Sequence, residues 1–400
     1  GCVTMSPMSR PRPFCVACLF LLAVFALETA ALPLSLSAAE PSLPVTPYVN
    51  SAAALLMEWH TGTLIYEHNA FKRMHPASIT KMMTALLTLE QGCLEDSVEI
   101  SWEAASQPGS SMYLKEGDVF AVQDLLYGLM LNSGNDAAWA LAEYIGGTAE
   151  EFFDMMNQRA REMGAVNTRF SNPHGITDPN HYTTAFDLAL IAKTCLKHPY
   201  FRHWVATKEK DVIEAEKGVV TSLENTNRLL WLYLGADGVK TGTTESAGQC
   251  LVASATRDGM RLLAVVLDSG DRWSDAARLL EYGFGSYRVA QVAVAGETLV
   301  SLPTKGSFQK TVPIVCVYDL FACVPRDRSG LRVEVDLPKV ISAPMAAGTV
   351  VGRAVVYLGD DPQGHTPLAT GEWINARTPA GVLIRLASSI LKKLLTSGIL

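Results

Sequence analysis

Hydrophobic residues along the chain follow β-type patterns in two regions and helical spacing between them. Residues 52–57 and 60–66 predict a strand, a turn and a second strand. Residues 248–255 and 261–267 carry the alternating or continuous apolar runs that are typical of strands. Between these regions apolar residues recur at helical spacing in four segments, which are 78–91, 122–130, 137–145 and 150–163. The pattern predicts a domain with strands at both ends and a large helical block in the middle.

A second domain is predicted beyond residue 284, where the composition changes. Residues 289–357 are rich in valine, proline and short polar turns, and they have almost no helical periodicity. We therefore expect an α+β fold in which a first domain at 47–284 is followed by a small β-rich domain at 288–374.

The end of the chain has the pattern of an amphipathic helix at 380–397. No acidic residue follows Glu372, and the four basic residues after it, Arg377, Arg385, Lys392 and Lys393, give the end of the chain a local charge of +4. An apolar face beside basic residues is typical of a helix that lies on an anionic membrane surface, although packing against the β-rich domain is an alternative. The apolar face consists of Leu383, Leu386, Ala387, Ile390, Leu391 and Leu394, and the opposite face of Arg385, Ser388, Ser389 and Lys392.

The N-terminal segment has the pattern of a secretory signal peptide at 1–39. Arg10 and Arg12 precede an uncharged apolar run at 14–27, which is short for a membrane span, and small residues follow at 37–39. Residues 40–46 then form a linker. We expect export to the outer face of the cytoplasmic membrane, or to the periplasm in a cell with an outer membrane; an uncleaved anchor is the alternative.

Composition excludes some classes of protein. The 400 residues carry a net charge of −7, so attraction to nucleic acid is not expected. Eight cysteines are too few and too scattered for a disulfide scaffold, and they show no zinc-type spacing outside the N-terminal segment. His174, Asp178 and His181 match no standard metal pattern. We expect neither a metal nor another cofactor.

Three short motifs carry the candidate chemistry. Ser78 and Lys81 are three residues apart near a helix start, so the lysine can reach the serine and act as its base. The same spacing recurs at Ser307/Lys310 and Ser389/Lys392 and is weak by itself. Only the first copy is followed, in order, by Ser133-Gly134-Asn135 and Lys240-Thr241-Gly242. This ordered set is typical of penicillin-binding proteins and class A β-lactamases.

The chain resembles the peptidase S11 family, the serine-type D-alanyl-D-alanine carboxypeptidases of low molecular weight among penicillin-binding proteins. The resemblance covers roughly residues 47–373. It rests on the three motifs and on the longer blocks 76–85, 124–137, 170–175 and 181–185. It implies a β-lactamase/transpeptidase-like domain, with an antiparallel sheet and a helical block, then a small all-β domain and a C-terminal amphipathic helix. Implied partners are peptidoglycan stem peptides ending in D-Ala-D-Ala and β-lactams as covalent inhibitors.

The resemblance also implies a role for each motif residue. Ser78 is the expected nucleophile, Lys81 its proton acceptor and Ser133 the group that passes a proton to the leaving D-alanine. Asn135 is expected to hold the substrate backbone or Lys81. The remaining expected contacts, to the substrate carboxylate or the oxyanion, come from Arg228, Lys240, Thr241, Gly242 and Thr243. Many members of the family have histidine at the position of Thr243, so the preference among substrates is open.

Three other functions fit part of the pattern. A class A β-lactamase would carry Glu-x-x-x-Asn between Ser133 and Lys240, and no glutamate there has asparagine at that spacing. A D,D-endopeptidase of the same family would share all three motifs. A peptidoglycan-binding protein without activity would not need every polar residue of the site.

Overall fold

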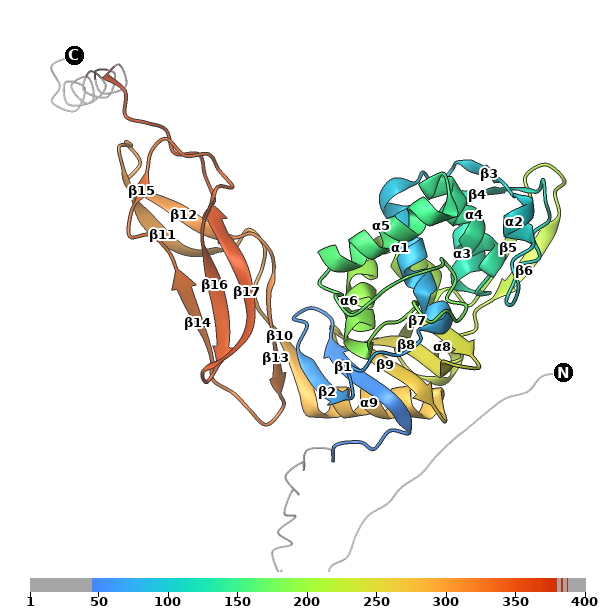
Figure 1. The fold of residues 1–400 in the computed structure, drawn as a ribbon. Coiled ribbons are helices and arrows are strands. Elements are labelled where there is room, and N and C mark those ends of the chain that lie inside the picture. Colours follow the sequence, from blue (N-terminus) through green and yellow to red (C-terminus); the bar gives the residue numbers. More distant parts are fainter. Residues whose placement is uncertain (1–44, 380–382, 384–386, 388–400) are drawn as a thin grey trace, which may run out of the picture. The chain divides into compact units, whose positions relative to one another are not determined.

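The computed structural model describes residues 45–379, 383 and 387 (Figure 1). The predicted signal peptide and nearly all of the predicted tail helix lie outside these residues. In the described part, no helix is long and apolar enough to cross a membrane. The helices are η1 (Ala77–Thr80, a 3-10 helix), α1 (Lys81–Gln91), α2 (Trp102–Ala105), α3 (Val122–Met130), α4 (Asn135–Gly146), α5 (Ala149–Glu162), α6 (Ala185–Cys195), α7 (Pro199–Ala206), α8 (Leu229–Leu232) and α9 (Arg272–Ser286).

The first domain is built on a five-stranded antiparallel sheet with the strand order β2-β1-β9-β8-β7. Strands from the two ends of the domain sequence pair directly, because β1 lies between β2 and β9. Two short two-stranded sheets, β3–β4 and β5–β6, stand apart from this sheet. The strands are β1 (Ser51–Glu58), β2 (Leu64–His68), β3 (Ser97–Glu99), β4 (Val119–Ala121), β5 (Glu209–Ile213), β6 (Val220–Glu224), β7 (Ala236–Thr244), β8 (Gly248–Arg257) and β9 (Met260–Ser269).

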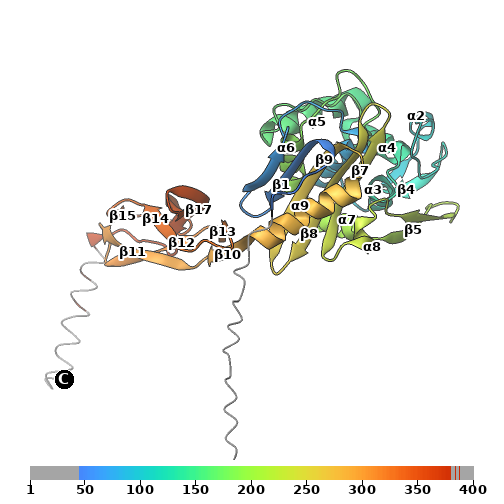
Figure 2. The same cartoon turned by 90° about the horizontal axis from the view of Figure 1, so that it is seen from below.

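Helices cover both faces of the sheet. Successive residues of a strand point to opposite faces, so Leu55 packs with the helical block while Leu56 packs with α9. Figure 1 shows the helical block on one side and α9 on the other, and Figure 2 shows α9 lying along the sheet. Burial on both faces explains why β1, β8 and β9 read as nearly continuous apolar runs.

The predicted elements are present, and others were missed. The strands at 52–57, 248–255 and 261–267 and the four helices match observed elements within a few residues, except that the first helix begins as the 3-10 helix η1. Only strands were expected at the end of this domain, and α9 was overlooked. The helices α6 and α7 and the β5–β6 hairpin were also not identified.

The C-terminal domain is all-β, as predicted. It contains a six-stranded sheet with the order β14-β16-β17-β12-β11-β15 and a two-stranded sheet, β10-β13. Its own core includes Val312, Ile314, Leu320, Val356 and Leu368. The strands are β10 (Tyr287–Ala293), β11 (Thr298–Lys305), β12 (Thr311–Cys316), β13 (Leu320–Pro325), β14 (Leu331–Asp336), β15 (Ile341–Ser342), β16 (Val350–Leu358) and β17 (Asp361–Thr370).

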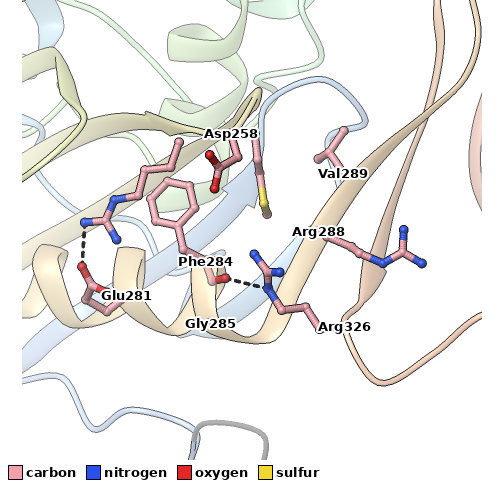
Figure 3. A pocket seen from close by; sticks show the side chains of 9 residues that line it. Asp258, Glu281, Phe284, Gly285, Arg288, Val289 and Arg326 are labelled. Atoms are coloured by element: carbon pink, nitrogen blue, oxygen red, sulfur yellow. Dashed lines mark hydrogen bonds and ion pairs between the residues drawn. The ribbon is translucent and has the colours of Figure 1, made fainter. Parts of the chain in front are cut away.

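A cavity of about 410 Å³ lies at the C-terminal end of α9 (Figure 3). Arg326 Nε donates to the Phe284 carbonyl over 2.9 Å, and Arg257 Nη2 lies 2.7 Å from Glu281 Oε1. None of the predicted site residues lines this cavity. The candidate chemistry is found instead where α1, α4 and β7 meet.

Candidate active site

Ser78 lies on a strained turn at the start of the first helix. The residue before it, Ala77, has a φ of +49°, a left-handed conformation that is uncommon for a residue with a side chain. Ala77, Ile79 and Thr80 are buried, whereas Ser78 is partly exposed. The turn therefore presents one hydroxyl to solvent from a backbone that is fixed by its buried neighbours.

Lys81 is fully buried, and its amine is held by three oxygens. Lys81 Nζ lies 3.0 Å from Ser78 Oγ, 2.6 Å from Asn135 Oδ1 and 2.9 Å from the His174 carbonyl oxygen. The last two oxygens can only accept hydrogen bonds. A neutral lysine has two N–H groups and one lone pair, so it can donate to both and keep its lone pair for the Ser78 hydroxyl. The geometry suits Lys81 as the base for Ser78.

Burial is the main reason why the pKa values of both site lysines are low. Desolvation holds the pKa of Lys81 well below its ordinary value; the nearby charge of Lys240 adds to this, and Asp136 opposes it. Burial, followed by the charge of Arg272, lowers the pKa of Lys240 to about 7. Repulsion between the two lysine charges is therefore the smaller cause of the low pKa of Lys81, and desolvation is the larger one.

The second motif joins the first through Asn135. Asn135 begins α4 and its Nδ2 donates to the Pro108 carbonyl, so its Oδ1 is left facing Lys81. Of the two expected roles of Asn135, the structure shows the contact with Lys81.

Ser133 has a φ of +61°, and its buried Oγ has no hydrogen-bond partner among the described residues. Burying a hydroxyl without a hydrogen-bond partner costs free energy. Such a hydroxyl is well placed to form a hydrogen bond with a bound substrate.

The third motif lies on β7, directly against the nucleophile turn. Lys240, Thr241 and Gly242 are buried and Thr243 is exposed. A Cβ on Gly242 would lie 3.0 Å from Ser78 N and equally close to the Pro76 carbonyl oxygen. Any side chain here would press the strand and the turn apart, so glycine favours their close approach. The three motifs therefore meet at one place, as their order in the sequence suggested.

Arg272 is a site residue that the sequence analysis missed. It is the first residue of α9, and its Nη1 donates to Thr243 Oγ1 over 2.8 Å and to the Gly242 carbonyl over 3.0 Å. It lies 29 residues after Thr243, in a polar stretch with no motif, so no pattern in the chain pointed to it. Its guanidinium places a positive charge beside the end of the third motif.

Arg228, the arginine that was expected near this strand, is placed differently. It precedes α8 and is exposed, and in the described part of the chain its side chain makes no hydrogen bond to β7. The residue of this loop that contacts the motif is Thr226, whose Oγ1 lies 2.7 Å from Thr241 Oγ1. The arginine beside the site is Arg272.

The histidines near the site have partners within the protein. His174 Nε2 lies 3.1 Å from Gln107 Oε1, and its Nδ1 accepts from the Ile176 N–H. Burial lowers the pKa of His174 to about 3, so its ring is neutral near pH 7. His181 contacts Thr80 instead, and the described residues contain no group of three side chains placed to hold a metal ion.

Comparisons with known proteins agree with the geometry. The family profile described as D-alanyl-D-alanine carboxypeptidase, peptidase S11, matches residues 39–271. The chain belongs to the peptidase S11 family. A second profile, the C-terminal domain of penicillin-binding protein 5, matches residues 287–376, which contain the all-β domain.

Relatives in this family match over most of their length. The D-alanyl-D-alanine carboxypeptidase DacF of Bacillus subtilis is 35% identical over 330 residues, which are 80% of this chain and 85% of DacF. DacC of Escherichia coli is 34% identical, and the matched residues are 82% of this chain and 84% of DacC. The structure of penicillin-binding protein 5 from Haemophilus influenzae superposes with a TM-score of 0.71 at 30% identity, over 83% of this chain and 99% of that one.

Proposed function

We propose that this peptidase S11 protein removes the terminal D-alanine from peptidoglycan stem pentapeptides, through an acyl-enzyme on Ser78, in the maturation of the cell wall. The observation that carries this proposal is the position of Lys81 Nζ, which is 3.0 Å from Ser78 Oγ and buried between two further oxygen atoms. A serine hydroxyl is a weak nucleophile, and a neutral amine at this distance can take its proton. The family and its named relatives support the same activity.

The first half of the reaction forms an ester. Ser78 Oγ attacks the carbonyl carbon between the two D-alanines as its proton moves to Lys81. The carbonyl oxygen becomes negative and is bound by the backbone N–H groups of Ser78 and Thr243, which the close contact at Gly242 holds near each other. The C–N bond then breaks, and the leaving D-alanine nitrogen takes a proton through Ser133. Water hydrolyses the ester in the second half and frees Ser78.

The free carboxylate of the substrate needs a positive site. Lys240 is buried with a pKa of about 7, so in the empty site it is only partly protonated near neutral pH. An incoming carboxylate favours the charged form and raises this pKa again. Arg272, which already bonds Thr243, supplies a second cation at the same end of the site. We assign carboxylate binding to Lys240, Thr241, Thr243 and Arg272.

Release of D-alanine tests the proposed function directly. The purified protein is incubated with a pentapeptide ending in D-Ala-D-Ala, and free D-alanine is measured over time. Repeated release of one D-alanine per peptide is expected. A protein that binds the peptide without releasing D-alanine would be a binding protein, and cleavage of cross-linked dimers alone would indicate an endopeptidase.

The arginine beside the site gives a prediction with its own control. Arg272→Ala should lower kcat/KM for the pentapeptide about ten- to hundredfold, since a hydrogen bond to a charged group contributes about 1.5–3 kcal/mol. The loss should be mainly in KM. Arg228→Ala, which removes an exposed arginine, should change kcat/KM less than twofold. A large loss in Arg228→Ala with none in Arg272→Ala would reverse the assignment.

We also propose that the protein is exported and works at the outer face of the cytoplasmic membrane. The apolar and basic pattern at 380–397 and the signal-like pattern at 1–39 support this location. The substrate is a cell-wall peptide, which is consistent with an enzyme outside the cytoplasm.

Membrane attachment through the tail can be tested by truncation. Arg377 still contacts the C-terminal domain, because its N–H donates to the Gly306 carbonyl and its guanidinium lies over the Phe308 ring. A mature chain ending at Arg377 should therefore fold but lose binding to vesicles that contain anionic lipid. Each basic residue near such a surface adds about 1 kcal/mol, so added salt should also weaken binding by the full-length mature chain. Equal binding by both chains would contradict a tail anchor.

A further inference from the structure

His181 is buried beside η1, the 3-10 helix that contains Ser78. Its hydrogen bonds define which ring nitrogen carries the proton. The backbone N–H of Ser171 donates to His181 Nδ1 over 3.2 Å, so Nδ1 is an acceptor. Burial lowers the pKa of His181 to about 4, so the ring is neutral. The single ring proton is therefore on Nε2, which lies 2.8 Å from Thr80 Oγ1.

Thr80 extends this chain of hydrogen bonds to the residue before the nucleophile. Because Thr80 Oγ1 accepts from His181, its own proton is free to donate, and it donates to the Ala77 carbonyl oxygen over 2.9 Å. Thr80 is 1% exposed and His181 is also 1% exposed, so water does not compete for these groups. The chain of donors runs in one direction, from Ser171 through His181 and Thr80 to Ala77.

The Ala77 carbonyl and the Ser78 N–H belong to the same peptide unit. A trans peptide is planar and its C=O and N–H point in opposite directions, so fixing one fixes the other. This peptide follows the left-handed φ of Ala77, a conformation that needs support from its surroundings. The backbone at Gly175 packs directly against this peptide, since a Cβ there would lie 1.8 Å from the Ala77 oxygen.

We propose that His181 and Thr80 are positioning residues that orient and polarise the Ser78 N–H as an oxyanion donor. A hydrogen bond to the Ala77 oxygen draws electrons along the peptide and makes the Ser78 N–H a stronger donor. Neither side chain touches the substrate. The inference rests on the proposed acyl-transfer function, in which the Ser78 N–H binds the negative oxygen of the tetrahedral intermediate.

Matched threonine variants test this relay. Thr80→Val removes the relay hydroxyl and keeps the shape of the side chain, and Thr80→Ser restores the hydroxyl. Thr84→Val is the control: Thr84 is buried on α1, which directly follows Thr80, and its Oγ1 donates to the Pro173 carbonyl over 2.6 Å, not to Ala77. For each variant we would measure the melting temperature, the acylation rate with penicillin, and binding of a peptide boronic acid, which forms a tetrahedral adduct with serine.

The relay predicts a specific pattern among these variants. Thr80→Val should lose about ten- to hundredfold in acylation rate and in boronic acid affinity, less than the 10²- to 10³-fold typical of removing an oxyanion donor outright. Its affinity for the product peptide should stay within twofold of the wild type. Thr80→Ser and Thr84→Val should keep wild-type acylation, whatever their melting temperatures. Equal losses in Thr80→Val and Thr84→Val would overturn the proposal.

A spectroscopic readout keeps the proposal testable if Thr80→Val fails to fold. In the full chain labelled with ¹⁵N-histidine, the ring signals of His181, identified by their loss in His181→Gln, should show a neutral ring protonated on Nε2 between pH 6 and 8. A proton on Nδ1, or a charged ring, would overturn the relay. This readout does not depend on activity: a wild type that forms no acyl-enzyme would contradict the proposed function, whereas the wrong tautomer would contradict only the relay.

Discussion

Replacing Lys240 by glutamine is expected to reduce D-alanine release by about a hundredfold or more while the protein stays folded. The lysine charge is assigned both to the substrate carboxylate and to lowering the pKa of Lys81. Glutamine can do neither, and general base catalysis, which here needs a neutral Lys81, typically contributes 10²- to 10⁴-fold. The melting temperature should not fall much. A folded-state pKa of about 7 lies below that of the unfolded chain, so at pH 7 the proton on this lysine favours unfolding.

A half-buried lysine outside the site, Lys193, provides the control for this prediction. Lys193 also has a pKa lowered mainly by burial, and its Nζ is near the His60 carbonyl rather than the catalytic groups. Lys193→Gln should keep nearly full activity. The pH profile of the wild type should rise as Lys81 loses its proton and fall as Lys240 loses the charge that binds substrate. Unfolding of Lys240→Gln, or an equal loss of activity in Lys193→Gln, would contradict the prediction. Either result would indicate that Lys240 supports the folded structure and that its charge does not act on the substrate.

The parts of the site that were predictable are those whose chemistry fixes the local spacing. Ser78 and Lys81 must be three apart on a helix to be within reach, and this constraint is visible in the sequence. Gly242 was expected within its motif, and the structure supplies the reason, which is the close approach of β7 to the nucleophile turn. Such constraints act over a few residues and leave a readable pattern.

Contacts between distant segments were not predictable in the same way. Arg272 reaches Thr243 only because α9 starts at the edge of the site, and no local pattern distinguishes it from the other arginines of the domain. The helix itself did leave a signal that was overlooked: Ala276, Leu279 and Leu280 have helical spacing, and Asp271 caps the helix through the N–H groups of Trp273 and Ser274. In contrast, α6 is buried on most sides, and its long apolar run does not distinguish a helix from a strand.

Ser78→Ala is expected to abolish both the release of D-alanine and covalent labelling by penicillin. A β-lactam resembles D-Ala-D-Ala, so Ser78 should open its ring and keep the product as an ester. The leaving group of the opened ring stays attached and hinders the approach of water, whereas free D-alanine departs. The chain also lacks the Glu-x-x-x-Asn segment with which class A β-lactamases position that water. Penicillin should therefore label the wild type one-to-one and leave slowly, while the peptide turns over repeatedly.

The other serines with the same spacing serve as controls for this assignment. Ser307 lies in the C-terminal domain, where its Oγ accepts the Gln309 N–H and, among the described residues, makes no hydrogen bond with Lys310. Ser389 lies outside the described residues. Alanine at either position should leave labelling and turnover intact, because neither serine is followed in the sequence by the second and third motifs. Labelling that survives in Ser78→Ala would mean that another serine is the nucleophile. Rapid, repeated hydrolysis of penicillin by the wild type would instead assign the protein as a β-lactamase, since only a site that admits water to the penicillin ester can release it quickly.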